Sequence, residues 1–266
     1  MNKHLPARRF LQSMRSAVKV SSLSMGTKRV KSVVLSQIRR NFVRRNTFDS
    51  LKNAHFDLQT IIRKFLDLKG AHLQDLWVLS NTGLHSGFFV EFGGYDGIAS
   101  SNTYTLEKNY GWKGIVVEPA IGMKNQLVEN RSCYLDFRAI WDKSNEIIEF
   151  TEDSVEGYLS VASMDSLIDT ENPKTKYRVK TVTLWDLLKH HNAPKLIDYI
   201  SVDVEGSELR ILSNFFENNT DYEISLWTVE HNYRENKEEI SKLFQKYGYE
   251  VVSEELSSRD FWFKKK

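Results

Sequence analysis

Short apolar runs without a helical period recur along the chain from residue 88 onward. The four clearest cover residues 88–92, 114–117, 196–202 and 224–229, and an acidic residue lies at the end of each run. Unbroken apolar runs of this length predict strands that are buried on both faces of a parallel sheet.

The segments between these runs have helical spacing and residues that favour helix starts. Thr183 and Asp186 form a variant capping box, and Ser100-Ser101-Asn102 offers N-cap side chains after the first strand. Helices are therefore predicted over residues 73–79, 105–110, 122–130, 183–188, 207–216 and 237–247. Residues 249–252 and 260–263 predict a terminal hairpin.

Two stretches differ from this alternation. Residues 132–137 predict a third strand that runs on toward Ala139 and Ile140. Residues 147–182 break into short apolar runs separated by polar residues and Pro173, which predicts an insertion that shapes an acceptor pocket. The whole pattern predicts an α/β, Rossmann-like fold with a mainly parallel sheet and an antiparallel C-terminal hairpin.

A turn dense in glycine follows the first predicted strand. Gly93, Gly94 and Gly97 can take positive φ and carry no Cβ, so a ligand can approach the backbone closely. A strand, a glycine turn and a helix in this order are how a doubly wound α/β sheet opens a nucleotide site.

The acids at the ends of the first two strands indicate which nucleotide is bound. Glu118 lies 27 residues after Glu91 and can accept both ribose hydroxyls of an adenosine. A dinucleotide fold uses the same device, but the glycine pattern here is not G-x-G-x-x-G. A pyrophosphate would be repelled by Glu91, whereas a sulfonium with an α-amino group would be attracted. S-adenosylmethionine therefore fits better than NAD.

Five segments over residues 70–255 resemble the FkbM-type methyltransferase family. They are Gln74-Asp75-Leu76-Trp77-Val78, Val90-Glu91-Phe92-Gly93-Gly94-Tyr95-Asp96-Gly97, Ser101-Asn102-Thr103-Tyr104 with Leu106-Glu107, Gly111-Trp112 with Gly114 and Glu118-Pro119, and Asp198-Tyr199-Ile200-Ser201-Val202-Asp203-Val204-Glu205-Gly206-Ser207-Glu208-Leu209. The resemblance implies a class I methyltransferase fold with a seven-stranded sheet. It also implies S-adenosylmethionine as methyl donor and a hydroxyl acceptor on a sugar, polyketide or similar small molecule.

The residues expected to bind the cofactor lie in the glycine turn, at the strand ends and in the neighbouring loops. Gln74 sits where such folds place a lid over the cofactor, and Arg138 and Ala139 follow the third strand near the expected adenine. The full set is Gln74, Glu91, Gly93, Gly94, Asp96, Gly97, Ser101, Asn102, Glu118, Pro119, Arg138, Ala139 and Asp203.

The catalytic candidates follow the last two parallel strands. We expect Asp203 and Glu205 to orient the acceptor, His231 to act as base or relay, and Glu230 to assist. An ordinary histidine pKa near 6.5 would poise His231 close to neutral pH. The same side chains could instead hold a divalent cation such as Mg²⁺, but nothing in their spacing demands a metal, and we expect none.

The charge of the chain is unevenly distributed. Residues 1–46 hold 12 Lys and Arg and no acid; removing these 12 from the 37 basic residues leaves 25 against 35 acidic ones. This arm is compatible with a solvated segment, with a helix that binds an anionic membrane or polyanion, and with a transit peptide. The single Cys133 excludes an internal disulfide.

These observations predict a basic arm over residues 1–46 and a methyltransferase domain over residues 47–266 that opens with a helical cap, 47–80. No run of about 20 apolar residues exists, so we expect a cytoplasmic protein whose arm can hold it at a membrane surface. The predicted function is O-methylation of a small acceptor, such as a glycan or glycolipid sugar. The alternatives are a non-catalytic interaction protein docked through its arm and an NAD-dependent oxidoreductase.

Overall fold

The computed structural model describes residues 67–83, 86–153, 160–162, 174–252, 257 and 259–266. All of them belong to one compact unit, Ile61–Lys266. The predicted basic arm and most of the predicted helical cap lie outside the described residues, so both stay predictions. No helix in the described ranges is long and apolar enough to cross a membrane.

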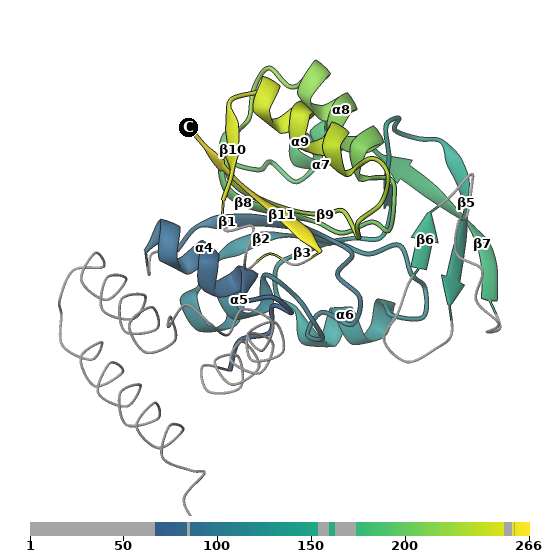
Figure 1. Ribbon diagram of the computed structural model, residues 1–266. Helices are drawn as coiled ribbons and strands as arrows, with labels where there is room; N and C mark the ends of the chain where they lie inside the picture. The colour runs from purple at the N-terminus through teal and green to yellow at the C-terminus, as the bar shows by residue number, and fades with distance from the viewer. Residues whose placement is uncertain (1–66, 84–85, 154–159, 163–173, 253–256, 258) are drawn as a thin grey trace, which may run out of the picture. The chain divides into compact units, whose positions relative to one another are not determined.

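A seven-stranded sheet forms the centre of the unit (Figure 1). Its strands run in the order β10-β11-β9-β8-β1-β2-β3, and β11 pairs antiparallel with both β9 and β10 while the other pairs are parallel. The strands are β1 (Phe88–Phe92), β2 (Lys113–Val117), β3 (Tyr134–Asp136), β8 (Leu196–Val202), β9 (Glu223–Glu230), β10 (Tyr249–Val251) and β11 (Asp260–Lys265). The predicted class I methyltransferase architecture, with its antiparallel C-terminal hairpin, is confirmed.

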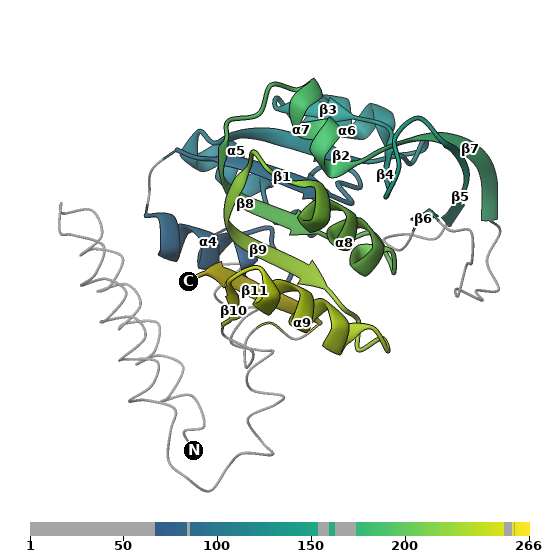
Figure 2. The same ribbon diagram turned by 90° about the horizontal axis from the view of Figure 1, so that it is seen from above.

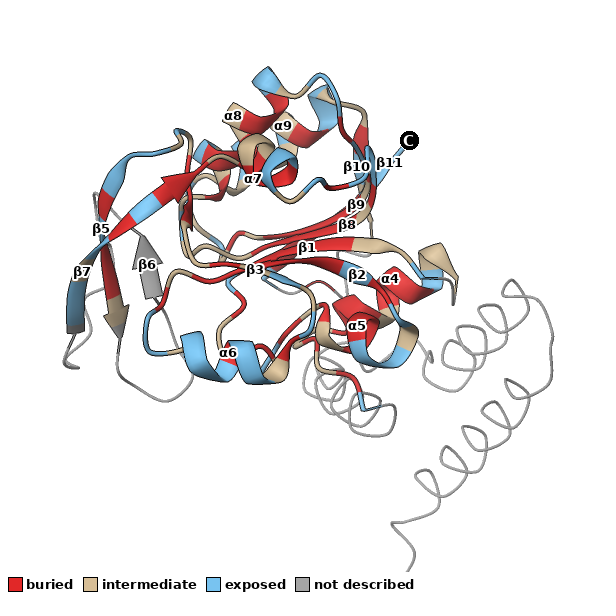
Figure 3. Cartoon of the chain, turned by 180° about the vertical axis from the view of Figure 1, so that it is seen from behind, coloured by how far each residue is buried: buried red, intermediate tan, exposed pale blue. Residues whose placement is uncertain are grey.

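Alternation along β1 shows why this strand is apolar on both faces. Val90 and Phe92 pack into one core with the helices α7 (Leu184–His190), α8 (Glu208–Asn218) and α9 (Lys237–Lys246). Phe89 faces the opposite core. Because successive side chains of a strand point to opposite faces, both sets are buried between helices and sheet (Figure 3).

The second core lies under the other helical layer. Its members come from α4 (Gln74–Thr82), α5 (Tyr104–Tyr110) and α6 (Lys124–Asn130) together with the sheet, and Trp77 meets Trp262 of β11 at 5.1 Å between ring centroids. The two helical layers lie on opposite faces of the sheet in Figure 1.

Helix starts follow the sequence signals. Thr183 Oγ1 accepts from the Asp186 amide at 3.1 Å, as the predicted capping box requires. Ser101 Oγ accepts from the Tyr104 amide at 3.0 Å at the start of α5. These side chains satisfy amides that a helix terminus leaves without an intrahelical partner.

The predicted insertion, residues 147–182, supplies three strands of a second, four-stranded sheet in the order β4-β7-β5-β6. This insertion sheet comprises β4 (Ala139–Ile140), β5 (Ile147–Asp153), β6 (Ser160–Ala162) and β7 (Lys174–Val182). The fourth strand, β4, is the stretch that was predicted to extend the third strand; that prediction is wrong, because β4 pairs with β7 and β3 ends at Asp136. A third core cluster links the insertion sheet to the main sheet, through residues such as Ala120, Trp141 and Phe150. Figure 2 places it on the side of the molecule where the parallel strands of the main sheet end.

Candidate functional site

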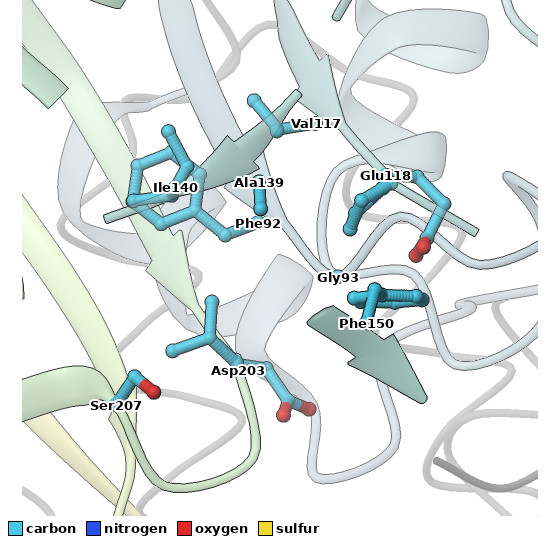
Figure 4. A pocket seen from close by; sticks show the side chains of 11 residues that line it. Phe92, Gly93, Val117, Glu118, Ala139, Ile140, Phe150, Asp203 and Ser207 are labelled. Atoms are coloured by element: carbon cyan, nitrogen blue, oxygen red, sulfur yellow. The ribbon is translucent and has the colours of Figure 1, made fainter. Parts of the chain in front are cut away.

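A cavity opens at the carboxyl ends of β1, β2 and β8, where open α/β sheets bind ligands. Most of its wall is apolar, and the insertion sheet contributes one aromatic ring (Figure 4). The lining residues are Phe92, Gly93, Val117, Glu118, Pro119, Ala139, Ile140, Phe150, Asp203, Val204 and Ser207. Five of the predicted cofactor residues, Gly93, Glu118, Pro119, Ala139 and Asp203, are therefore brought together at one site.

Glu118 follows directly after β2 and is 5% exposed. Its Oε2 accepts from the Tyr95 amide at 2.8 Å and its Oε1 from the Ala120 amide at 2.8 Å. Burial, with a smaller contribution from the charge of Glu152, raises the pKa of Glu118 to about 7, against the effect of those two amides. Each carboxylate oxygen still has capacity to accept a hydroxyl of a ligand.

Gly93 allows two loops to meet at the floor of the cavity. Its φ is +76°, and a Cβ placed there would lie 2.3 Å from the Asp203 carbonyl oxygen. Its amide and that of Gly94 donate to the Val117 carbonyl at 3.1 and 3.2 Å. Only glycine therefore fits this position, and the backbone itself forms part of the cavity wall.

Three acids gather beside the cavity at the ends of β8 and β9. One carboxylate oxygen each of Asp203, Glu205 and Glu230 lies within 4.8 Å of the others. Burial and the neighbouring charges, Glu230 first, raise the pKa of Asp203 well above its ordinary value. Burial, followed by the charges of Glu205 and Glu208, raises the pKa of Glu230 to about 8. Like charges in a desolvated site favour the protonated form of at least one member.

Glu205 differs from its two neighbours because it has a cationic partner. Arg234 Nη2 donates to Glu205 Oε2 at 3.0 Å, and Glu205 adopts a left-handed backbone with φ +60°. Burial raises the pKa of Glu205, and the charge of Arg234 opposes that rise. Compared with Glu205, Asp203 and Glu230 therefore more strongly favour sharing a proton or binding a cation. Metal dependence stays untested.

His231 lies outside this group of three acids. Its ring is buried against Phe261, with ring centroids 4.6 Å apart, and its Nδ1 accepts from the Tyr233 amide at 3.1 Å. Burial and the nearby Lys237 charge lower its pKa to about 4. The expectation that His231 is poised near neutral pH is therefore wrong, because that expectation assumed a solvated imidazole. It does not line the cavity.

Glu91 holds the loop before α5 and does not line the cavity. Its carboxylate accepts from Ser101 Oγ at 2.9 Å, from the Asn102 amide at 2.7 Å and from Thr103 Oγ1 at 2.6 Å. Arg131 Nη1 completes the set at 3.1 Å. Glu91 is an inner residue of β1 on the α5 side of the sheet, and these contacts occupy its carboxylate. The prediction that it binds the cofactor stays untested.

The remaining predicted cofactor residues also contact protein groups and do not line the cavity. Ser101 and Asn102 reach Glu91 and Ser201, Asp96 accepts from the Ile98 and Ala99 amides, and Gly94 and Gly97 lie against Val116 and Arg131. Gln74 Nε2 donates to Asp260 at 2.6 Å. Arg138 pairs with Asp136. The prediction that they touch the cofactor stays untested.

Phe150 is a lining residue that the sequence pattern did not single out. It belongs to β5, 32 residues beyond Glu118, in a stretch whose broken apolar pattern gives no sign of which side chain turns toward the cavity. Only the pairing of β5 with β7 places it there. Val204 and Ser207 follow Asp203 in the same motif, so the signal for them was adjacency to a predicted site residue.

A protein-family model described as the methyltransferase FkbM domain matches residues 91–251, which is more than half of the chain. The chain belongs to this family. The match spans the cavity, the acid cluster and the insertion sheet, and the methyltransferase assignment drawn from the motifs is thereby confirmed.

The FkbM chain also has low similarity to solved methyltransferase structures. The METTL16 MTase domain aligns at 10% identity and a TM-score of 0.41, over 71% of this chain and 64% of that one. Precorrin-6y C5,15-methyltransferase from Geobacter metallireducens aligns at 8% identity and a TM-score of 0.39, over 73% of this chain and 85% of that one. A search of curated proteins found no match.

Proposed function

We propose that this chain is an S-adenosylmethionine-dependent O-methyltransferase that acts on a hydroxyl of a small acceptor, namely a sugar of a glycan or glycolipid. The observation that carries the proposal is Glu118, a buried carboxylate at the end of β2 that lines the same cavity as Gly93 and Asp203. An adenosine ligand needs such an arrangement, with an acceptor for its ribose hydroxyls beside an apolar wall for its base.

The residues present fit the donor in three respects. Glu118 has lone pairs free for two hydroxyls, and Gly93 leaves the backbone open to close approach. Ala139, Ile140 and Phe150 provide an apolar wall on the Glu118 side. When bound, the donor supplies an electrophilic methyl group on a sulfonium. The contribution of the chain is to align the two reactants and to exclude water.

The acceptor hydroxyl has to lose a proton during the reaction. Asp203 and Glu230 lie next to each other at the strand ends, and their raised pKa values make them stronger bases once ionised than an ordinary carboxylate. Asp203 also lines the cavity, so we assign it the proton-accepting position and Glu230 a supporting one. Arg234 keeps Glu205 paired, which leaves Glu205 to orient the acceptor.

Donor binding is the direct test of the proposal. Calorimetric titration with S-adenosylmethionine, S-adenosylhomocysteine and NAD should give binding of the first two only. Glu118→Ala should weaken that binding about 10- to 100-fold, because hydrogen bonds to a charged group are lost. Glu129→Gln, at an exposed site on α6, is the matched control and should bind like the wild type.

The pKa of Glu118 supplies a second signature of the same contact. The ionised fraction of Glu118 rises through a pKa of about 7, and the ionised form is the better hydrogen-bond acceptor. Donor affinity should therefore rise between pH 6 and pH 8 in the wild type and stay level in Glu118→Gln. Wild-type affinity in Glu118→Ala would remove Glu118 from the proposed donor site, and binding of NAD alone would exclude the proposed donor.

The acceptor class needs a separate assay. Incubation with methyl-labelled donor and a panel of free glycans, lipid-linked sugars and non-sugar hydroxyl compounds should label the sugars. Labelling restricted to the non-sugar compounds would contradict the glycan assignment while leaving O-methylation intact.

Removal of residues 1–46 tests the proposed contact of the arm with anionic membranes. Binding to anionic vesicles should disappear, and donor affinity should stay unchanged.

A further inference from the structure

We propose that the four-stranded insertion sheet is a wall of the donor site and that Glu152 and Tyr177 are positioning residues that hold this wall against the loop after β2. The inference rests on the proposed donor, and it concerns two side chains that do not line the cavity. They act through the backbone of residues 120–122 and through Phe150.

The geometry of β5 and β7 sets three side chains on one face of the insertion sheet. Phe150 of β5 pairs directly with Tyr177 of β7, and their ring centroids are 5.5 Å apart. Glu152 is two residues beyond Phe150, so it points to the same side of β5. Phe150 is 1% exposed and lines the cavity, and Figure 4 shows its ring next to the Glu118 carboxyl.

Glu152 and Tyr177 form a clasp with the loop after β2. Tyr177 Oη donates to Glu152 Oε2 at 2.5 Å and accepts from the Ile121 amide at 2.9 Å. Glu152 Oε1 accepts from the Gly122 amide at 3.2 Å. A Cβ on Gly122 would lie 2.2 Å from Glu152 Oε1, so the carboxylate reaches the backbone only because residue 122 is glycine.

The clasp continues the contacts that orient Glu118. The amide of Ala120 donates to Glu118, and the next two amides, of Ile121 and Gly122, are bound by Tyr177 and Glu152. Three successive amides of one loop thus join the ribose-binding acid to the insertion sheet. Releasing the last two would free the loop and shift both Glu118 and Phe150, which face the adenosine end of the donor.

The chemistry of this wall suits a purine base. Phe150 gives an aromatic surface, and Ala139 and Ile140 give small and branched apolar contacts on the same cavity. Stacking of a flat ring on an aromatic side chain adds to the area it buries. The insertion sheet therefore contributes to donor affinity as well as to the acceptor pocket that the sequence pattern predicted.

The closing experiment uses Tyr177→Phe, which removes only the hydroxyl, and Glu152→Gln, which removes the charge. We expect S-adenosylhomocysteine to bind about three- to tenfold more weakly to each, measured by calorimetry, as the loss of one or two hydrogen bonds implies. KM for the donor should rise by the same factor, and kcat should change less than twofold. Hydrogen exchange at the Ile121 and Gly122 amides should accelerate.

The exposed ion pair between Lys176 and Glu149, 2.7 Å apart on the same two strands, offers a matched control. Lys176→Met and Glu149→Gln should change neither donor affinity nor exchange in the loop. Faster exchange at residues 121 and 122 with unchanged donor affinity in Tyr177→Phe would overturn the inference. Absence of donor binding by the wild type would instead overturn the proposed function itself, so the two failures are distinguishable.

Discussion

Glu91 lies one residue inside the end of β1 and Glu230 ends β9 of the same sheet, yet their surroundings are opposite. The Glu91 carboxylate accepts from two hydroxyls, a backbone amide and the buried guanidinium of Arg131. Glu230 Oε2 is buried and has no hydrogen-bond partner among the described residues, and acids surround it. Donors compensate the buried charge of Glu91, whereas a buried oxygen of Glu230 lacks a donor among the described residues, and this difference favours the proton chemistry proposed for the second acid.

Arg131 is the cation that neutralises the buried acids on the Glu91 side of the sheet, the compensated region. Its Nε donates to Glu107 at 2.5 Å and its Nη2 to Thr103 at 2.8 Å, and its side chain is fully buried. Although burial alone would raise the pKa of Glu107, the Arg131 charge lowers it. In the described part of the chain no cation neutralises Asp203 in this way, and burial and like charges raise the pKa of Asp203. Substitutions in both regions, around Arg131 and around Asp203, test this difference.

Asp203→Asn should have the largest effect on turnover among substitutions in the acid cluster of Asp203, Glu205 and Glu230. Removal of the proton acceptor should lower kcat about 100- to 10,000-fold on an acceptor from the panel, while donor affinity changes little. Radiometric turnover and calorimetry measure the two quantities. Asp221→Asn, at an exposed acid that pairs with Lys195, is the control. A loss of less than threefold in kcat would remove Asp203 from the reaction.

Arg131→Met should have the largest effect on the compensated side. It leaves the buried carboxylate of Glu91 without its cation and Glu107 with Lys108 alone, so the free energy of unfolding should fall by about 3–5 kcal/mol. Urea denaturation measures it. Arg210→Met, which breaks the more exposed pair with Asp142, should cost less than about 1 kcal/mol. Equal losses in the two variants would mean that the buried network is not what secures this side of the sheet.

Glu230→Gln should have the smallest effect, visible in the pH dependence of stability. A carboxyl whose folded pKa is about 8 binds more protons when folded, so its contribution lowers stability as pH rises from about 5 to about 8. In Glu230→Gln the free energy of unfolding should lack this fall, which is about 1–3 kcal/mol between pH 5 and pH 8. Unfolding free energies at pH 5, 6.5 and 8 in both proteins test it. Parallel curves would show that Glu230 has an ordinary pKa in the folded state.

Most helices and strands were predicted from local sequence patterns, namely apolar runs and helix caps. The predicted strand over residues 196–202 has the same bounds as β8, and the capping box at Thr183 starts α7 where it was placed. The mainly parallel sheet and its antiparallel hairpin followed from strand–helix alternation, and the seven strands from the family resemblance, whereas the order of the strands was not predicted. The insertion was recognised only as an irregular stretch, because its strands pair across long separations, as between β4 and β7.

The cofactor contacts predicted for the site residues stay predictions, and the structure gives two of these residues different surroundings. Strand-end acids were found, but the sequence treated Glu91 and Glu118 as a pair that grips one ligand. Glu118 lies just past the end of β2 and turns into the cavity, whereas Glu91 is one residue inside β1 and faces α5. Glu91 pairs with Val116, so alternation alone would point Glu118 to the same face as Glu91. The two differ because the chain leaves the strand before Glu118, and the apolar pattern does not reveal the last residue of a strand.

The sequence by itself determined the fold, the family and the strand ends where the candidate site was expected, because periodicity, glycine turns and strand-end acids are local properties of the chain. Only the tertiary structure decided the surroundings of each acid and the position of the insertion beside the cavity. Whether a carboxylate is neutralised depends on groups brought from elsewhere, such as Arg131 beside Glu91 or Glu205 beside Glu230. The position of Phe150 at the cavity likewise depends on distant groups, because the pairing of β5 with β7 sets where its side chain points and no local sequence signal does.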